Sequence, residues 1–97
     1  MQIRKGDTVY ACSDLDISLL RGTKHILFSI TEPVSPKSVE ALFGGSSFYF
    51  YDDVLKGRFP CTDGFDLIGV SIKYLANLTC NVVLKLTKGD VDNESNV

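Results

Sequence analysis

The sequence predicts an α+β domain: a mostly antiparallel β-sheet with one short helix packed on one of its faces. Two observations give this fold class. Apolar and polar residues alternate through most of the chain, which is the period of a half-buried strand. A single segment near the middle has helical spacing instead. The predicted order is four strands, one helix and three strands, an order typical of α+β domains.

The four strands before the helix form two predicted hairpins. Residues 2–4 and 8–12 flank a polar turn that contains glycine, which indicates the first hairpin. In residues 15–19 and 26–30, apolar side chains recur at every second position on either side of a second glycine turn. Each run therefore has one face suited to a core.

The helix is predicted over residues 35–43. Ser35 is a good N-cap, and Pro36 follows at the first helical position, where its missing N–H costs nothing. An apolar stripe lies at spacing i, i+3 and i+4: Val39, Leu42 and Phe43. Gly44-Gly45 then ends the helix, because glycine adopts a left-handed C-cap without steric cost. So short a helix forms only if its stripe docks on a sheet.

The next predicted strand, residues 47–51, is the most aromatic stretch of the chain. Because side chains alternate along a strand, Phe48 and Phe50 share one face. Tyr49 and Tyr51 share the other face. We expect the phenylalanines in the core.

The C-terminal part contains the clearest hairpin. Residues 58–64 have no regular pattern, whereas residues 68–74 and 79–86 alternate strictly and predict two paired strands. Residues 89–97 are acidic and contain almost nothing to bury, so a disordered tail is expected there. The single α+β domain is therefore predicted over residues 1–88.

Composition excludes several classes of protein. The chain has 97 residues, a net charge of −2, 44% hydrophobic and 23% charged residues, which is ordinary for one globular domain. The apolar runs are too short for a membrane span, and the polar start does not resemble a signal peptide. Basic residues are scattered, so neither a nucleic-acid partner nor a membrane partner is expected.

Cysteine usage predicts free thiols. The chain has an odd number of cysteines, and no two of them have the C-x-x-C spacing: Cys12, Cys61 and Cys80. With His25 as the only histidine, neither a disulfide framework nor a zinc site is indicated. We expect three unpaired thiols in a reducing compartment.

No catalytic constellation is evident in the sequence. His25 opens a strand, and pairing with Cys12 or Cys80 in space is conceivable, but buried structural thiols are the better interpretation. Neighbouring carboxylates fit solvated strand faces and turns: Asp14/Asp16, Asp52/Asp53 and Asp63/Asp66. We therefore expect no enzyme activity, no cofactor, no metal and no small-molecule substrate.

The candidate functional residues are tyrosines. Tyr49 and Tyr51 are expected on the outer face of their strand, where Tyr10 and Tyr74 could join them from neighbouring strands. Tyrosine is enriched at protein interfaces because it is large, stiff and amphipathic. Two other interpretations stay open: ordinary cross-strand pairing, and stacking of bases, although residues 47–51 contain no Arg or Lys for the latter.

In size and layout the chain resembles small proteins encoded among the tail and baseplate genes of phages and prophages of Gram-positive bacteria. The resemblance rests on residues 1–7, the helix at 35–43 and the closing strands 68–74 and 79–86. It implies a non-enzymatic structural or assembly protein of a phage tail, found in the virion or the bacterial cytoplasm, that acts through a protein partner or by self-association. It transfers no site residues. The alternative function is a small modulator that binds and inhibits one bacterial host protein.

Overall fold

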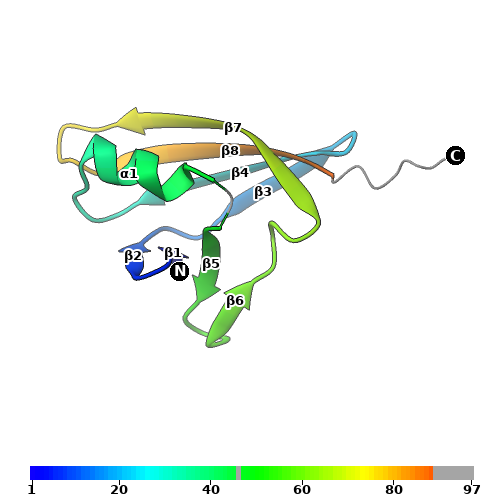
Figure 1. Cartoon of the computed structure of the whole chain (residues 1–97), viewed down its shortest axis with the longest axis horizontal. Coiled ribbons are helices and arrows are strands. Elements are labelled where there is room, and N and C mark those ends of the chain that lie inside the picture. Colours follow the sequence, from blue (N-terminus) through cyan, green and yellow to red (C-terminus); the bar gives the residue numbers. More distant parts are fainter. Residues whose placement is uncertain (46, 89–97) are drawn as a thin grey trace, which may run out of the picture.

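In the part of the chain that the structure describes, eight strands form two four-stranded antiparallel sheets, with one helix between the fourth and fifth strands (Figure 1). The computed structural model describes residues 1–45 and 47–88. Sheet A has the order β2 (Thr8–Ala11), β1 (Gln2–Lys5), β5 (Tyr49–Asp52), β6 (Gly57–Phe59). Sheet B has the order β3 (Asp16–Leu20), β4 (Thr23–Ile30), β8 (Cys80–Lys88), β7 (Phe65–Tyr74). The predicted fold class is confirmed; the predicted acidic tail lies outside the described residues.

Each sheet consists of two hairpins joined side by side. The three predicted hairpins are present as β1–β2, β3–β4 and β7–β8, all antiparallel. A fourth hairpin, β5–β6, completes sheet A and adds one strand to the seven that the sequence predicts. Only three residues long, β6 is too short to show alternation, so its stretch looks irregular in the sequence.

The division into two sheets depends on which strands pair. In sheet B, β4 pairs with β8 over eight residues, and in sheet A, β1 pairs with β5 over three. Alternation identifies the buried face of a strand but not its neighbour, so the sequence does not distinguish one sheet from two. The sheets are linked by a bridge between Cys12 and Ile30 and by the Thr31 N–H, which donates to the Ala11 carbonyl.

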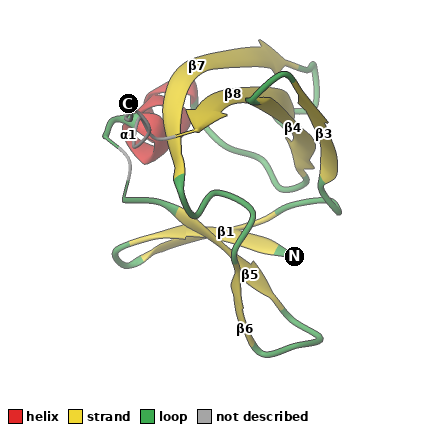
Figure 2. Cartoon of the chain, turned by 90° about the vertical axis from the view of Figure 1, so that its right-hand side faces the viewer, coloured by secondary structure: helices red, strands yellow, loops and turns green. Residues whose placement is uncertain are grey.

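The helix α1 (Pro36–Phe43) lies between sheet B and the β1–β2 hairpin (Figures 1 and 2). The Ser35 hydroxyl accepts from the backbone N–H of Ser38, as an N-cap should. At the other end, the Lys5 Nζ donates to the carbonyls of Ala41 (2.8 Å) and Gly44 (2.6 Å). Beyond the helix Gly45 takes φ of +94°, so it is the second glycine that adopts the left-handed conformation.

The core lies between the sheets and under the helix. Val39 and Leu42 of the helix are buried in it. Phe50 on β5 meets Phe28 on β4 edge-to-face, with ring centroids 5.1 Å apart, and so joins sheet A to sheet B. The other fully buried large side chains are Ile3, Ile26, Ile30, Leu84, Leu86, Val82 and Cys80. No helix in the described part of the chain is long and apolar enough to cross a bilayer.

Candidate protein-interaction surface

The two predicted faces of the aromatic strand are present in the structure. Phe48 and Phe50 are buried, with exposed fractions of 5% and 0%. Tyr49 and Tyr51 lie on the opposite side of β5 and are half-buried. The prediction that the phenylalanines fill the core is therefore confirmed, and the tyrosine rings belong to the outer face of sheet A.

Two arginines from neighbouring strands lie against these tyrosines. The Arg4 guanidinium on β1 lies 3.7 Å from the centroid of the Tyr51 ring, and that of Arg58 on β6 lies 4.6 Å from the centroid of Tyr49. The register pairs Arg4 with Tyr49 and Arg58 with Tyr51, so each arginine contacts the diagonal tyrosine. Each such cation–π contact contributes about 0.5–1 kcal/mol at an exposed site.

Arg4 has a further restraint. Its Nε and Nη2 both donate to the Gln2 Oε1, at 2.9 and 2.6 Å. Gln2 and Arg4 are two residues apart on β1 and therefore share one face of the strand. The guanidinium is thus held between an amide oxygen and an aromatic ring.

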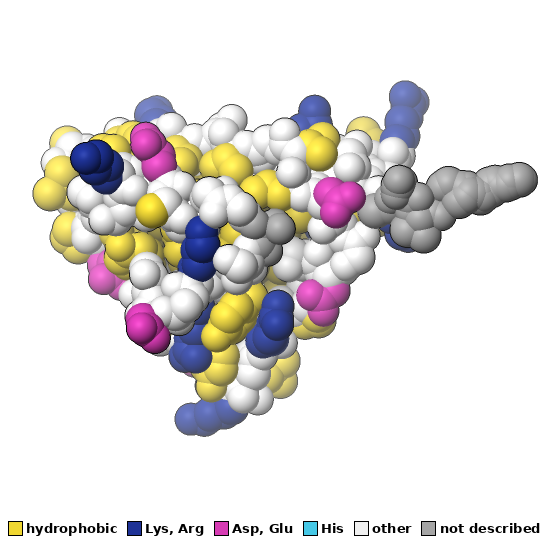
Figure 3. All heavy atoms as spheres, viewed as in Figure 1, with side chains coloured by type: hydrophobic (Ala, Val, Ile, Leu, Met, Phe, Trp, Pro, Cys, Tyr) yellow, Lys and Arg dark blue, Asp and Glu magenta, His cyan; other side chains and the backbone are white. Residues whose placement is uncertain are grey.

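We call the set Gln2, Arg4, Tyr49, Tyr51 and Arg58 the arginine–tyrosine face. Within residues 1–45 and 47–88 the single ion pair joins the Met1 ammonium to Asp53, so neither arginine has a carboxylate partner in this part of the chain. Figure 3 shows basic and hydrophobic side chains next to one another over β5 and β6, at the bottom of the view. The surface is therefore aromatic and cationic.

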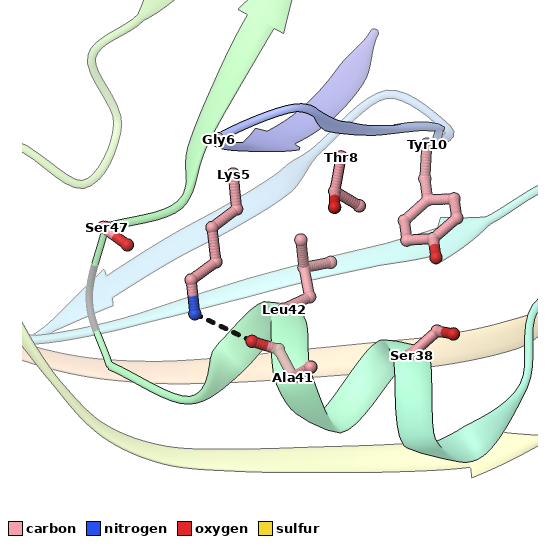
Figure 4. Close-up of a pocket in the computed structure, with 8 residues that line it drawn as sticks. All are labelled: Lys5, Gly6, Thr8, Tyr10, Ser38, Ala41, Leu42 and Ser47. Carbon is pink, nitrogen blue, oxygen red and sulfur yellow. Dashed lines mark hydrogen bonds between the residues drawn. The ribbon is translucent and has the colours of Figure 1, made fainter.

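The other two predicted tyrosines lie elsewhere. Tyr10 on β2 pairs with the buried Ile3, so it is on the inner side of sheet A. It lines a groove of about 520 Å³ between the β1–β2 hairpin and α1 (Figure 4). Tyr74 ends β7 in sheet B, where its hydroxyl is 3.5 Å from the Pro36 carbonyl, and desolvation raises its pKa. The structure brings together two of the four candidates and separates Tyr10 and Tyr74 from them.

The sequence did not identify the two arginines as site residues. Arg4 sits at a position that alternates with the buried Ile3, so its outward direction is visible in the sequence. That β1 and β6 flank β5 is not visible there, because pairing of distant segments leaves no local pattern. Residues 47–51 contain no basic residue, as noted above, but their neighbours in the sheet supply two.

The cysteines and the histidine do not form a site. All three thiols are free and buried. Burial raises the pKa of Cys12 and of Cys61 to about 11 and also raises that of Cys80, which favours the unreactive thiol form. His25 pairs with Ser18 and Lys85 and lies on the outer face of sheet B. Cys80 pairs with Ile30 on the core-facing side, so the histidine and this thiol lie on opposite faces of the sheet.

The carboxylates have structural partners or face solvent. Asp52 Oδ1 accepts from the N–H groups of Val54 (2.8 Å) and Leu55 (3.1 Å), which is a turn-forming contact. Asp53 lies 3.1 Å from the Met1 ammonium and raises the pKa of that group. No group of three or more potential metal ligands exists among the described residues.

Comparison with known proteins adds no relative. No family model, no curated protein and no solved structure matches the chain.

Proposed function

We propose that this chain is a non-enzymatic binding module that docks on a partner protein through the arginine–tyrosine face. The observation that supports this most is the stacking of Arg4 on Tyr51 and of Arg58 on Tyr49 on the outer face of sheet A. Tyrosine and arginine are the side chains most enriched in interface hot spots. Here they are already fixed in place, which lowers the entropy that binding costs.

Charge gives the chemistry of the partner. Two guanidinium groups that form no ion pair within residues 1–45 and 47–88, beside two amphipathic rings, complement a surface that presents Asp or Glu next to apolar groups. The proposed partner is therefore an acidic protein surface or segment. A single-stranded nucleic acid has phosphates and bases that the same groups could contact, and the experiment below distinguishes it.

The biological setting follows from the resemblance stated above. We propose assembly into a phage or prophage tail as the first setting, and inhibition of one bacterial host protein as the second. A tail component binds other tail proteins and is recovered with them, whereas an inhibitor forms a one-to-one complex with a host protein. The identity of the partner decides between the two.

The test is photo-cross-linking in the cells in which the chain is native. Benzoylphenylalanine replaces Tyr49 or Tyr51 in separate variants, and a matched variant carries it at Val54, which is 87% exposed on the nearby β5–β6 turn. We expect one protein, identified by mass spectrometry, to cross-link from positions 49 and 51 but not from 54. Equal labelling from all three positions, or a product destroyed by nuclease, would overturn the proposal.

Binding to the identified protein is then measured with purified components. The double variant Tyr49→Ser/Tyr51→Ser should bind at least about a hundredfold more weakly, because two hot-spot rings and the stacking of both arginines are lost. Val54→Ser is the control and should bind within about twofold of wild type. Thermal unfolding of Val54→Ser should stay close to wild type, and the tyrosine variant should lose only about 1–2 kcal/mol, the worth of its two cation–π contacts, since the tyrosines lie outside the core.

A further inference from the structure

The two sheets have four edge strands, and three of them are protected. Unpaired edges invite pairing with another chain unless a bulge, a charge, a covering segment or a short length prevents it. On β2 the Ala11 N–H donates to the Glu32 carboxylate at 2.7 Å, and the Ala11 carbonyl accepts from Thr31. The opposite edge of sheet A, β6, has only three residues.

In sheet B the β7 edge is protected in three ways. Its register with β8 shifts between Leu67 and Gly69, so the strand contains an irregularity of the bulge type. Near its end it carries Lys73, and Tyr74 approaches the start of α1 through the Pro36 carbonyl. Positive charge and a neighbouring helix both discourage strand addition.

The β3 edge is the least protected of the four, because its register contains no bulge and its one charge, Asp16, stands at the first position of the strand. It pairs with β4 in unbroken register over all five residues, and every one of the five is exposed. It contains no proline, no lysine and no bulge. Leu19 and Leu20 are 61% and 70% exposed, and Ile17 is 38% exposed. Figure 2 shows β3 at the outer side of sheet B, with no further strand beyond it.

We infer that β3 pairs antiparallel with β3 of a second copy of this chain, centred on Ser18, so that the two B sheets form one eight-stranded sheet. In this register Ile17 lies opposite Leu19 of the second copy. Both residues are on the core-facing side of sheet B, because Ile17 pairs with the fully buried Ile26 in β4. The two-fold axis therefore joins apolar side chains to apolar side chains, and the inner faces become continuous.

The charges of β3 also favour a second copy. Acidic residues, Asp14 and Asp16, precede or open the strand, and Arg21 follows it. An antiparallel copy brings the acidic end of one strand beside the basic end of the other, twice over, and places no like charges opposite one another. The β3 edge is thus complementary to itself in apolar character on its core-facing side and in charge at its two ends.

Sedimentation equilibrium of the full chain is the first test. We expect a concentration-dependent equilibrium between one and two chains. Leu19→Lys should raise the dimer dissociation constant at least about tenfold, because it places two ammonium groups in the apolar pair. Leu55→Lys, at another exposed leucine on the β5–β6 turn (70%), is the control and should leave the constant within about twofold. Circular dichroism of each variant checks that the fold is intact.

Disulfide trapping tests the register. Ser18 lies on the proposed axis, so two copies of Ser18→Cys come within the Cα distance that a disulfide requires. Leu20 faces Asp16 of the second copy, so Leu20→Cys should not form a covalent dimer with itself. The buried native thiols do not compete. Non-reducing electrophoresis after mild oxidation should therefore show a dimer for Ser18→Cys and a monomer for Leu20→Cys.

Three results would overturn the inference: a monomer at every soluble concentration, a dimer unaffected by Leu19→Lys, or trapping through position 20 in preference to 18. The inference is independent of the proposed function. Tyr49→Ser/Tyr51→Ser removes partner binding and leaves the sedimentation equilibrium unchanged, whereas Leu19→Lys does the reverse.

Discussion

Sheets A and B have the same number of strands but differ in strand length and in the contacts that stabilise them. Sheet B contains strands of five to ten residues, and β4 pairs with β8 over eight positions. The strands of sheet A have three or four residues, and its two hairpins meet through three pairs between β1 and β5. Sheet B buries long alternating runs, whereas sheet A depends on a few large side chains that pack across to sheet B. Stability in sheet A is therefore concentrated at its contacts with sheet B.

The first prediction concerns the central contact between the sheets. Phe50→Ala should lower the free energy of unfolding by about 3–5 kcal/mol, because Phe50 is fully buried and packs edge-to-face on both Phe28 and Phe48. Urea unfolding measures the loss, and amide hydrogen exchange measures where protection is lost. We expect the amides of β1 and β5 to lose protection before those of β4 and β8.

The matched control is Tyr49→Ala, the adjacent residue on the other face of β5. It removes one cation–π contact and should cost about 1 kcal/mol or less. If the two variants lose the same stability, or if β4 opens together with β1 in Phe50→Ala, the contrast between the two sheets does not hold.

The difference in strand length explains why the sequence predicts sheet B better than sheet A. The hairpins of sheet B follow from local alternation, such as Cys80, Val82, Leu84 and Leu86, all of which are buried. The helix follows from Ser35, Pro36 and its stripe, because caps act within a few residues. These features need no knowledge of distant contacts.

The candidate site could be predicted only in part. The outward direction of Tyr49 and Tyr51 follows from alternation within β5 itself. The arginines that contact them come from β1 and β6, and Arg4 is 47 positions from Tyr51 in the chain. Alternation within a strand does not show that Tyr10 faces inward in sheet A or that Tyr74 belongs to sheet B. The pairing of β1 with β5 brings Arg4 next to Tyr51, and the alternation of apolar and polar residues does not predict which strands pair.

The second prediction concerns two thiols at the places where the sheets connect. Cys12 bridges to Ile30 of β4, and Cys61 lies in the connection from β6 to β7. Burial raises the pKa of each to about 11 from an ordinary value of 9.0, so the folded state holds the thiol proton more tightly than the unfolded state. Stability is therefore complete below pH 9 and falls as the pH rises from 9 to 11.

Urea unfolding at a series of pH values measures this loss. The variant Cys12→Ala/Cys61→Ala should lose less stability between pH 9 and 11 than the wild type, although its stability at pH 7 is lower because two buried side chains are smaller. Parallel curves for the two proteins through this window would mean that the connections between the sheets do not exclude water from these thiols.

The third and smallest prediction concerns a polar link between the sheets. Lys24 on β4 donates from Nζ to the Cys61 carbonyl at 2.6 Å, and the same ammonium lies 4.0 Å from the centroid of the Phe65 ring. It therefore holds the β6–β7 connection against sheet B. Lys24→Met keeps most of the aliphatic stem but removes both contacts and leaves that carbonyl without its charged donor.

We expect Lys24→Met to cost about 1–2 kcal/mol in thermal or urea unfolding, since a hydrogen bond from a charged group and a cation–π contact are lost together. Lys85→Met is the control, because Lys85 is exposed on the outer side of β8, and it should change stability by about 0.5 kcal/mol or less. Amide exchange adds the decisive detail: in Lys24→Met the N–H of Cys61, which donates to the Phe59 carbonyl, should exchange faster while the β4–β8 amides keep their protection. Loss of protection across β4 instead would show that Lys24 stabilises sheet B itself, and that sheet A contributes more to sheet B than its short strands indicate.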